Sequence, residues 1–402
     1  MRLIIFTSHP IQYQAPLFRA LAARPDLEVL VVFSYVPQPK EQGLGFGRPI
    51  VWDVPVRAGF ESVVVKSFQI LGTKPGFFHR FGLDFGSHIT AFKPDVALIL
   101  GWHDATLMQA YLACQLKSIP IIMRGESNAL RGRSKLTQAF HRLYMRGVRA
   151  VLAIGDSNRQ FFEKAGVDAN KIVMAKYFID NDTFAKNAED SRMDAVATRE
   201  KWQIPPAAFV AMFAGKLEGK KRVMDFLEGL RLAHEAGAPV YGLVVGDGDE
   251  KAQALAFADA HKLPCTFAGF LNQTEMPFAY SVANCLILPS DFGETWGLVV
   301  NEAMACGVPA IVSNHVGCSN DLVQNGVTGA VVPFADPQAI AEVLVRWTKN
   351  PEVHAQIAKT ARQHVTSGYT IELAVTGLLQ AIGHALPSRG STLSDGIKGR
   401  RV

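Results

Sequence analysis

A basic loop in the second half of the chain has the composition of an anion site. Residues 213–230 read FAGKLEGKKRVMDFLEGL, in which a strand pattern ends at Gly215 and Lys216 follows directly. Three further cations, at 220–222, stand just before a helix pattern. Cations at the end of a buried strand, beside a helix N-terminus, can bind phosphate. Charge runs are often only solvated surface, so the loop alone leaves both interpretations open.

A later loop carries two carboxylates around an apolar run. Residues 293–309 read GETWGLVVNEAMACGVP, with Glu294 before the run and Glu302 inside it. The pattern predicts a helix from about Gly297, ended by the Gly307–Pro309 segment. If both glutamates were helical, eight steps of 100° would leave them about 80° apart, so they would not form a stacked pair. Alternatively, Glu294 could be a capping acid and Glu302 a surface acid favoured by the helix dipole.

Two more loops follow predicted strands. Gly246 and Gly248 form a tight turn without a full G-x-G-x-x-G pattern, so the dinucleotide signal is weak. Asp247 and Asp249 match a short Asp-x-Asp metal pattern, but we favour their capping of the next helix. In 317–321, backbone N–H groups at the start of another helix could bind phosphate.

The elements that must position these loops alternate between strands and helices. Nearly continuous apolar runs predict parallel strands that are buried on both faces. The runs are 2–6, 28–33, 95–100, 119–123, 150–154, 171–175, 209–213, 240–245, 285–289 and 309–313, with a last strand after Gly329. The sequence therefore predicts an α/β protein with two doubly wound domains, whose ligands bind at the carboxyl ends of the strands.

The domain boundaries follow from composition. We predict a first domain over 1–190 and a second over 191–370, because a polar stretch without strand signal ends at two prolines near 205. We expect the helix pattern at 371–386 to pack back on the first domain, and the small, basic segment 387–402 to be disordered.

Composition narrows the class of protein. The chain has 402 residues, 49% of them hydrophobic and 19% charged, which suits two globular cores. Its five cysteines are scattered without a C-x-x-C pair, which favours buried thiols in a reducing compartment. No signal peptide or membrane-spanning run is evident, so we expect a cytoplasmic protein.

Taken in their order along the chain, these four loops resemble those of the retaining glycosyltransferases of family 4, which have the GT-B fold. The matching stretches are Gly215-Lys216-Leu217 with Lys221, Gly246-Asp247-Gly248, Glu294 through Pro309, and 317–321. The resemblance is strongest over about 209–345, and EAMACGVP is its most specific part. It implies two Rossmann-like domains that face each other across a cleft, the first binding the acceptor and the second binding the nucleotide sugar.

The resemblance also implies roles for individual residues. Lys216 and Lys221 would hold the donor diphosphate, Glu294 would lie at the donor sugar, and Glu302 would bind the ribose hydroxyls. The nucleobase would meet Phe270 and Leu271. Further donor contacts are implied for Gly215, Gly246, Phe292, Gly293, Gly297 and Leu298. Two departures from the family pattern are Lys216 in place of an arginine and Asp321 in place of a glutamate.

These roles suit metal-free sugar transfer. Two fixed lysines and helix N-termini can stabilise a departing diphosphate electrostatically, so we expect no metal and no cofactor. The sugar develops oxocarbenium character at the transition state, as in glycoside hydrolysis. We assign no protein nucleophile.

The first half offers candidates for the acceptor side. His9 and His103 each follow a predicted strand, and each could equally be a structural histidine. Glu126, after the strand at 119–123, is a candidate acceptor-side base.

A basic helix pattern at 134–149 suggests a membrane surface. Lys135, Arg142, Arg146 and Arg149 fall within about 60° of each other on a helix, at 100° per residue. Leu136, Phe140, Leu143 and Gly147 line an adjacent face. The pattern favours anionic lipid headgroups or a lipid-linked acceptor on the inner face of the membrane. The alternative is a surface helix whose apolar stripe packs on the sheet. Net charge is +5 and aromatic stacking motifs are absent, so we expect no nucleic-acid partner.

The favoured function is transfer of a sugar, with retention, from a UDP- or GDP-sugar to a glycan or lipid-linked acceptor in cell-surface polysaccharide or glycolipid synthesis. Two alternatives remain: a nucleotide-sugar epimerase of the same fold, and an inactive glycosyltransferase-like scaffold. A dinucleotide oxidoreductase is disfavoured by the incomplete glycine pattern.

Overall fold

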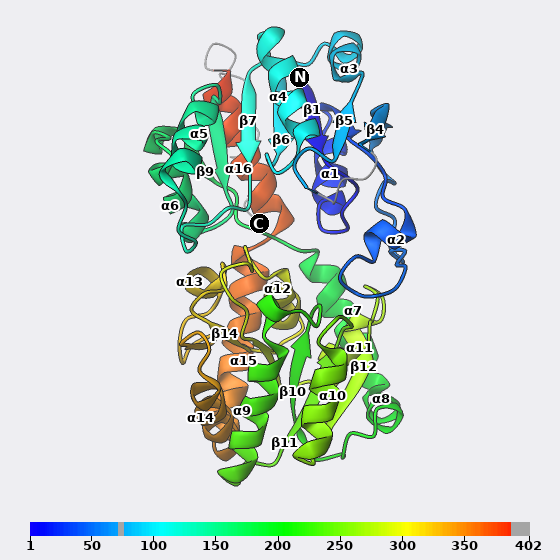
Figure 1. The fold of residues 1–402 in the computed structure, drawn as a ribbon, viewed down its shortest axis with the longest axis vertical. Helices are drawn as coiled ribbons and strands as arrows, with labels where there is room; N and C mark the ends of the chain where they lie inside the picture. The colour runs from blue at the N-terminus through cyan, green and yellow to red at the C-terminus, as the bar shows by residue number, and fades with distance from the viewer. Residues whose placement is uncertain (71–75, 387–402) are drawn as a thin grey trace. The chain divides into compact units, whose positions relative to one another are not determined.

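The computed structural model describes residues 1–70 and 76–386, which form two α/β units (Figure 1). Unit 1 comprises residues Met1–Pro37, Pro55–Tyr177 and 371–386. Unit 2 comprises Gln38–Val54 and Phe178–Thr370. Each unit has its own parallel sheet and its own core, so the predicted two-domain α/β architecture is confirmed.

Unit 1 is built on a seven-stranded sheet in the order β3-β2-β1-β6-β7-β8-β9. Its pairings are all parallel, and Leu3 to Phe6 in β1 are fully buried. Strands buried on both faces must be apolar at successive positions, which explains the runs in the sequence. The strands are β1 (Arg2–Thr7), β2 (Glu28–Phe33), β3 (Glu61–Val64), β6 (Val96–Leu100), β7 (Ile121–Arg124), β8 (Ala150–Ala153) and β9 (Ile172–Met174), with a separate antiparallel pair of β4 (Ser67–Gln69) and β5 (Arg80–Gly82).

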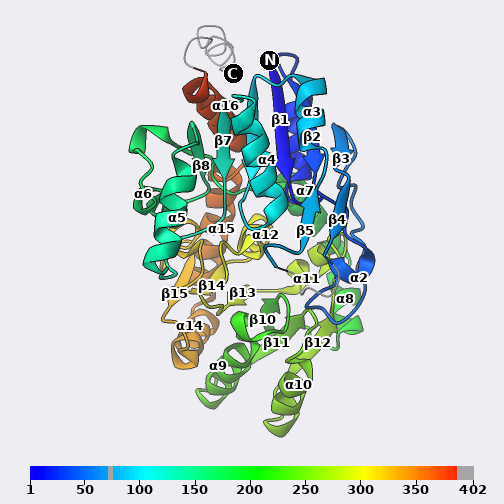
Figure 2. The ribbon, with the colours of Figure 1, turned by 45° about the horizontal axis from the view of Figure 1, so that its top comes forward.

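The helices of unit 1 lie on both faces of this sheet (Figure 2). They are α1 (Ala15–Ala22), α3 (Phe85–Phe92), α4 (Ala105–Leu116), α5 (Lys135–Met145), α6 (Asp156–Lys164) and α16 (Ile371–Ala385), with a 3₁₀ turn η1 (Ala169–Lys171). Helix α16 contacts α1, β7, β8 and β9. The predicted disordered segment 387–402 lies outside the described residues.

Unit 2 is built on a six-stranded parallel sheet in the order β12-β11-β10-β13-β14-β15. The strands are β10 (Phe209–Ala214), β11 (Val240–Val245), β12 (Cys265–Gly269), β13 (Cys285–Leu288), β14 (Ala310–Ser313) and β15 (Gly329–Val332). Its helices are α2 (Pro39–Gln42), α7 (Asn181–Met193), α8 (Ala195–Lys201), α9 (Val223–Glu235), α10 (Lys251–Ala260), α11 (Met276–Val282), α12 (Leu298–Ala305), α13 (Ser319–Leu322), α14 (Pro337–Lys349) and α15 (Pro351–Gly368), with a 3₁₀ turn η2 (Gly219–Lys221).

The predicted boundary at 190/191 is wrong, because unit 2 already begins at Phe178. Helix α7 packs on α11, α12 and α15, and the Asn181 amide donates to the carbonyls of Val365 and Tyr369. A polar composition suggested a linker here, but tertiary hydrogen bonds fix the segment instead. The segment 38–54, predicted as part of the first domain, also belongs to unit 2.

None of the helices within residues 1–70 and 76–386 is long and apolar enough to cross a membrane. The five cysteines are unpaired, and all except the half-buried Cys265 are buried.

Candidate active site

Lys221 and Glu294 are brought together at the carboxyl ends of the unit 2 strands. Lys221 ends the turn η2 after β10, and Glu294 lies in the loop between β13 and α12. The Lys221 ammonium donates a short hydrogen bond to Glu294 Oε2, and the two side chains are only 16% and 14% exposed. Such a desolvated pair has a stronger electrostatic interaction than a surface pair. Two residues predicted for catalysis therefore form one charged pair.

Glycines allow the neighbouring strand ends to approach closely. Gly215 donates its N–H to Val245 O at 3.0 Å, and Gly246 donates to Gly269 O at 2.8 Å. A Cβ on Gly246 would lie only 1.8 Å from Gly215 O. These positions, which the resemblance implies for donor binding, thus form a bare backbone surface beside the aliphatic part of Lys221, which lies 3.6 Å from a Cβ built on Gly215.

The turn after β14 holds the glutamate loop. Gly317 donates to Glu294 O at 3.1 Å and Cys318 donates to Trp296 O at 3.0 Å. A Cβ on Gly317 would lie 1.8 Å from Thr295 O, so the contact requires glycine. The sequence predicts that backbone N–H groups of 317–321 could bind phosphate. That prediction is wrong for residues 317–319 and 321, because these groups donate to backbone carbonyls.

Glu302 is enclosed in unit 2. It lies in α12 with 3% exposure, and the Tyr280 hydroxyl of α11 donates to its Oε2 at 2.7 Å. The alternative of a surface acid is therefore wrong, because burial of a carboxylate requires such hydrogen bonds. Glu294 and Glu302 have different partners, Lys221 and Tyr280, as expected of acids that do not stack. Tyr280 was not found from the sequence, because nothing in its local pattern pairs it with α12.

The other cations of the basic loop also have partners. Lys216 Nζ donates to Leu44 O at 2.6 Å and lies 5.0 Å from the centre of the Phe46 ring. Burial lowers the pKa of Lys216 below the ordinary lysine value. Lys220 pairs with Glu218 at 3.1 Å, and Arg222 makes two hydrogen bonds to Asp225. Each cation of the loop therefore has a specific partner, and the loop is not a freely solvated charge run.

The Asp-x-Asp loop is held by a lysine. Asp247 Oδ2 pairs with Lys251 Nζ at 2.9 Å, and Oδ1 accepts from Gly248 N at 3.0 Å. The predicted capping of the next helix is wrong, because α10 begins after Glu250 without a side-chain cap. Across 1–70 and 76–386, no three His, Cys, Asp or Glu side chains gather closely enough to hold a metal ion.

The remaining predicted donor residues lie around the same strand ends. Phe270 and Leu271 are half-buried directly after β12. Phe292 is exposed, with its ring centre 5.8 Å from that of His315, and Gly293 donates to Asp291 Oδ1 at 2.6 Å. Gly297 takes a left-handed conformation as the N-cap of α12, and Leu298 begins that helix.

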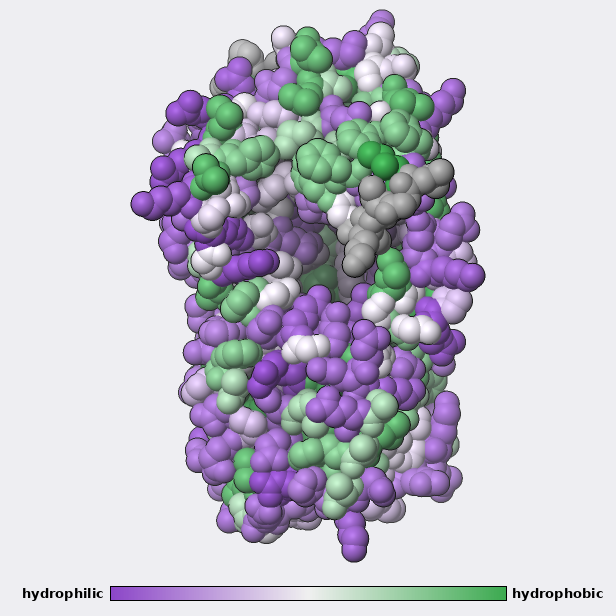
Figure 3. Space-filling view, viewed as in Figure 1, coloured by the Kyte–Doolittle hydropathy of each residue, from purple (hydrophilic) through white to green (hydrophobic). Residues whose placement is uncertain are grey.

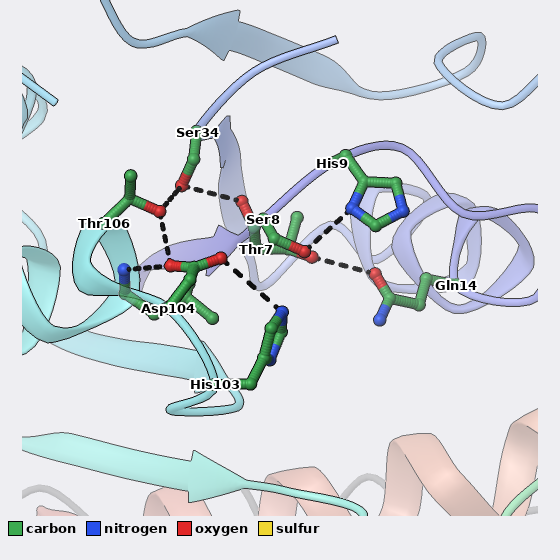
Figure 4. Close-up of polar contacts among 9 residues, drawn as sticks. Thr7, Ser8, His9, Gln14, Ser34, His103, Asp104 and Thr106 are labelled. Atoms are coloured by element: carbon green, nitrogen blue, oxygen red, sulfur yellow. Dashed lines mark hydrogen bonds and ion pairs between the residues drawn. The ribbon is translucent and has the colours of Figure 1, made fainter. Parts of the chain in front are cut away.

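A buried polar network in unit 1 lies beside two candidate histidines (Figure 4). Asp104 caps α4 by accepting from Leu107 N, and it also accepts from the Thr106 hydroxyl at 2.7 Å. Thr106 in turn bonds to Ser34 at 2.7 Å. His103 Nε2 lies 3.5 Å from Asp104 Oδ2 and His103 is 63% exposed, whereas His9 Nδ1 lies 2.9 Å from Ser8 Oγ. Ser34 also donates to Thr7 O at 3.4 Å, so the network joins the ends of β1, β2 and β6 and gives His103 a carboxylate neighbour.

The third acceptor-side candidate has a different environment. Glu126 is exposed after β7 and accepts a short hydrogen bond from the Tyr177 hydroxyl. Burial, then the nearby Glu126 charge, raises the pKa of Tyr177 well above the ordinary tyrosine value. The Arg124 guanidinium lies 4.6 Å from the centre of the Tyr177 ring. Glu126 thus lies near a buried tyrosine and an arginine.

Helix α5 exposes apolar side chains next to basic ones. Leu136 is 84% exposed, Phe140 45% and Leu143 66%. The four basic residues of the predicted stripe are exposed as well, but the predicted helix 134–149 is too long: α5 ends at Met145, so Arg146 and Arg149 lie beyond it. Figure 3 shows hydrophobic side chains among hydrophilic ones at the upper left, where α5 lies in Figure 1. The alternative in which this apolar stripe packs on the sheet is therefore wrong.

Comparison with known proteins matches part of unit 2 to a family model. Residues 195–364 match the family model described as glycosyl transferases group 1. The chain contains a group 1 glycosyltransferase domain. This domain lies within unit 2 and includes the Lys221–Glu294 pair.

Curated relatives of this chain are moderately similar to it. Alpha-D-kanosaminyltransferase of Streptomyces kanamyceticus is 25% identical over 301 residues, which cover 69% of this chain and 75% of that protein. D-inositol 3-phosphate glycosyltransferase of Salinispora arenicola is 28% identical over 245 residues, which cover 58% of this chain and 54% of that protein. The chain thus spans about half the length of the second relative.

A solved structure shares the fold. The crystal structure of Anabaena Alr3699/HepE in complex with UDP and glucose aligns with a TM-score of 0.69 at 15% identity, covering 95% of this chain and 99% of that chain. This likeness confirms the predicted GT-B fold class.

Proposed function

We propose that this chain transfers a sugar from a UDP- or GDP-sugar to a glycan or lipid-linked acceptor, with retention, in cell-surface polysaccharide or glycolipid synthesis. The observation that carries the proposal is the Lys221–Glu294 pair at the carboxyl ends of β10 and β13, within the group 1 domain. Ligands of open α/β sheets bind at that end of the strands.

The chemistry assigns different tasks to the two charges. Lys221, with Lys216, stabilises the diphosphate as it departs, because fixed cations in a dry site act most strongly where negative charge develops. Glu294 lies beside the donor sugar and favours its developing positive charge. This division requires neither a metal nor a cofactor. We therefore propose that the reaction uses neither.

A relative and a neighbour support the donor class. The kanosaminyltransferase is named for the transfer of a sugar, and the Anabaena structure holds UDP and glucose. By analogy, unit 2 is the donor-binding part of this chain, and unit 1, with His9, His103 and Glu126, is the acceptor-binding part.

A thermal-shift panel tests the donor class. UDP- and GDP-sugars are added to the full chain, and one of them is expected to raise the melting temperature, because a ligand that binds only the folded state stabilises it. The stabilising sugar is then incubated with candidate acceptors, and the anomeric configuration of the product is read by NMR. An inverted product would reject retention.

The same assay separates the alternatives. An epimerase would change the donor sugar without any acceptor. An inactive scaffold would bind the donor without turnover under any acceptor condition. The Lys221–Glu294 pair favours the transferase over the scaffold.

We also propose that α5 binds an anionic membrane surface. Exposed Leu136, Phe140 and Leu143, with exposed Lys135 and Arg142 on the same helix, are the features of an interfacial helix. Full-length protein should float with vesicles that contain phosphatidylglycerol, and less with neutral vesicles. Replacing Leu136 and Leu143 by serine should reduce flotation, whereas replacing the exposed Val353 of α15 should not. Equal flotation of both variants would reject the proposal.

A further inference from the structure

A segment remote in sequence lies on the donor-binding residues of unit 2. Residues 38–54 follow the second strand of unit 1 along the chain but belong to unit 2. The carbonyl of Leu44 in this segment accepts from Lys216, and the Phe46 ring lies against the same ammonium group. The segment therefore contacts one residue that the proposed function assigns to the diphosphate.

The far end of the segment is anchored next to β12. The Asn272 amide donates to Val51 O at 2.8 Å. Thr274 N donates to Asp53 Oδ2 at 3.1 Å, and the Thr274 hydroxyl donates to the same oxygen. Ile50 is buried. These contacts hold the segment against the loop that begins with Phe270 and Leu271.

Aromatic rings and a cation surround Phe270. The Phe46 and Phe270 ring centres are 5.0 Å apart in an edge-to-face arrangement, and those of Trp52 and Phe270 are 6.5 Å apart. The Arg48 guanidinium lies 5.8 Å from the Phe270 ring centre. All three rings are only partly buried, so each keeps surface for another flat group. Aromatic faces and guanidinium groups are the surfaces on which nucleobases stack.

One polar atom of this cluster has no partner. The indole Nε1 of Trp52 is buried and makes no hydrogen bond within the described part of the chain. An indole N–H is a donor only, and a buried donor without an acceptor costs free energy. The cluster thus offers stacking surfaces and one hydrogen-bond donor, which suits a flat ligand that carries a carbonyl oxygen.

We propose that residues 38–54 form a wall of the nucleobase subsite, where a uracil or guanine ring stacks among Phe46, Trp52 and Phe270 and a ring carbonyl accepts from Trp52 Nε1. This inference rests on the proposed function, since it concerns the donor of the same reaction. In this inference Trp52 determines nucleotide affinity, although it lies outside residues 195–364, which match the group 1 family model.

Calorimetry with two probes tests the wall. UDP or GDP, whichever binds the wild type more tightly, carries both base and phosphates, whereas inorganic pyrophosphate carries only the phosphates. Trp52→Ala should weaken nucleotide binding about tenfold or more, and Trp52→Phe should weaken it severalfold through loss of the N–H. Pyrophosphate binding should be unchanged in both variants. Lys216→Ala should weaken both probes, and Phe78→Ala, at an exposed ring of unit 1, should weaken neither.

Other outcomes overturn the inference. Unchanged nucleotide affinity in folded Trp52 variants would remove the wall but leave the proposed function intact, provided that Lys216→Ala and Lys221→Ala still weaken binding. A gain in affinity would make the segment an obstacle to the donor. Equal loss of both probes would make Trp52 a structural residue. A folded wild type that binds neither UDP nor GDP would overturn the proposed function together with the wall.

Discussion

Lys221 donates directly to Glu294, although 73 residues separate them in the chain. The lysine lies on the turn after β10 and the glutamate on the loop after β13, two strands that pair side by side. The pair therefore joins the cation proposed for the diphosphate to the carboxylate proposed for the sugar. A donor that binds between them must exchange protein contacts for ligand contacts.

The first prediction concerns Lys221. Lys221→Ala should reduce kcat by about 10²-fold or more, because it removes a charge that stabilises the leaving diphosphate. Steady-state rates with the identified donor measure the effect. The matched control is Lys220→Ala, which removes a neighbouring lysine that pairs only with Glu218 among the contacts described above. Equal rates for Lys221→Ala and the wild type would show that Lys221 does not act in the reaction.

A second prediction separates ribose binding from packing at Glu302. Glu302→Ala should weaken nucleotide binding by about 10- to 100-fold if its carboxylate accepts from ribose hydroxyls, the range expected for a charged hydrogen bond. Tyr280→Phe removes only the hydroxyl that donates to Glu302. Calorimetry should therefore show a smaller loss for Tyr280→Phe. Equal losses would mean that Glu302 acts by holding α11 against α12, and no loss in Glu302→Ala would exclude the ribose role.

The sequence predicts the sheets well and the site only in part. All ten apolar runs are strands, because burial on both faces demands apolar residues in succession. The apolar runs do not include strands β3 and β12, since Glu61 and Val64 are exposed and every residue of β12 is only half-buried. Lys221 and Glu294 were found through their motif. Tyr280, Tyr177 and Trp52 were not, because their roles depend on partners that only tertiary folding brings near.

A third prediction tests the turn that supports Glu294. Gly317→Ala should lower the free energy of unfolding by about 1–3 kcal/mol, the usual cost of overpacking, because its Cβ would meet Thr295 O. It should also lower kcat, since the displaced loop carries Glu294. Thermal unfolding and rates check the two effects. Gly383→Ala is the control: its Cβ would meet no atom within 4 Å, and alanine favours the surrounding helix α16. Equal behaviour of the two variants would mean that the loop relaxes freely.

A fourth prediction concerns pH. Burial lowers the pKa of His354 below the ordinary histidine value, although its hydrogen bond to Asn284 O opposes the shift. As pH falls below about 6.5, the His354 imidazole therefore binds a proton in the unfolded chain before it does so in the folded chain. Stability from the neutral imidazole is present above that pH and is lost as pH falls toward the folded pKa. Melting temperatures between pH 7.5 and 5 should fall less steeply for His354→Gln than for the wild type. The exposed His384→Gln should not change the slope, and an unchanged slope in His354→Gln would contradict the assignment.

The last prediction tests the metal-free mechanism. Activity should persist in excess chelator, because Lys216 and Lys221 supply the positive charge that a divalent ion supplies elsewhere. Asp247 already pairs with Lys251, so Asp247→Asn and Asp249→Asn should each leave the rate within a few-fold of the wild type. Protein treated with chelator and then resupplied with Mg²⁺ or Mn²⁺ provides the control for irreversible damage. Loss of activity in chelator, restored by the metal and abolished in the asparagine variants, would assign the ion to this loop and reject electrostatic stabilisation by lysines alone.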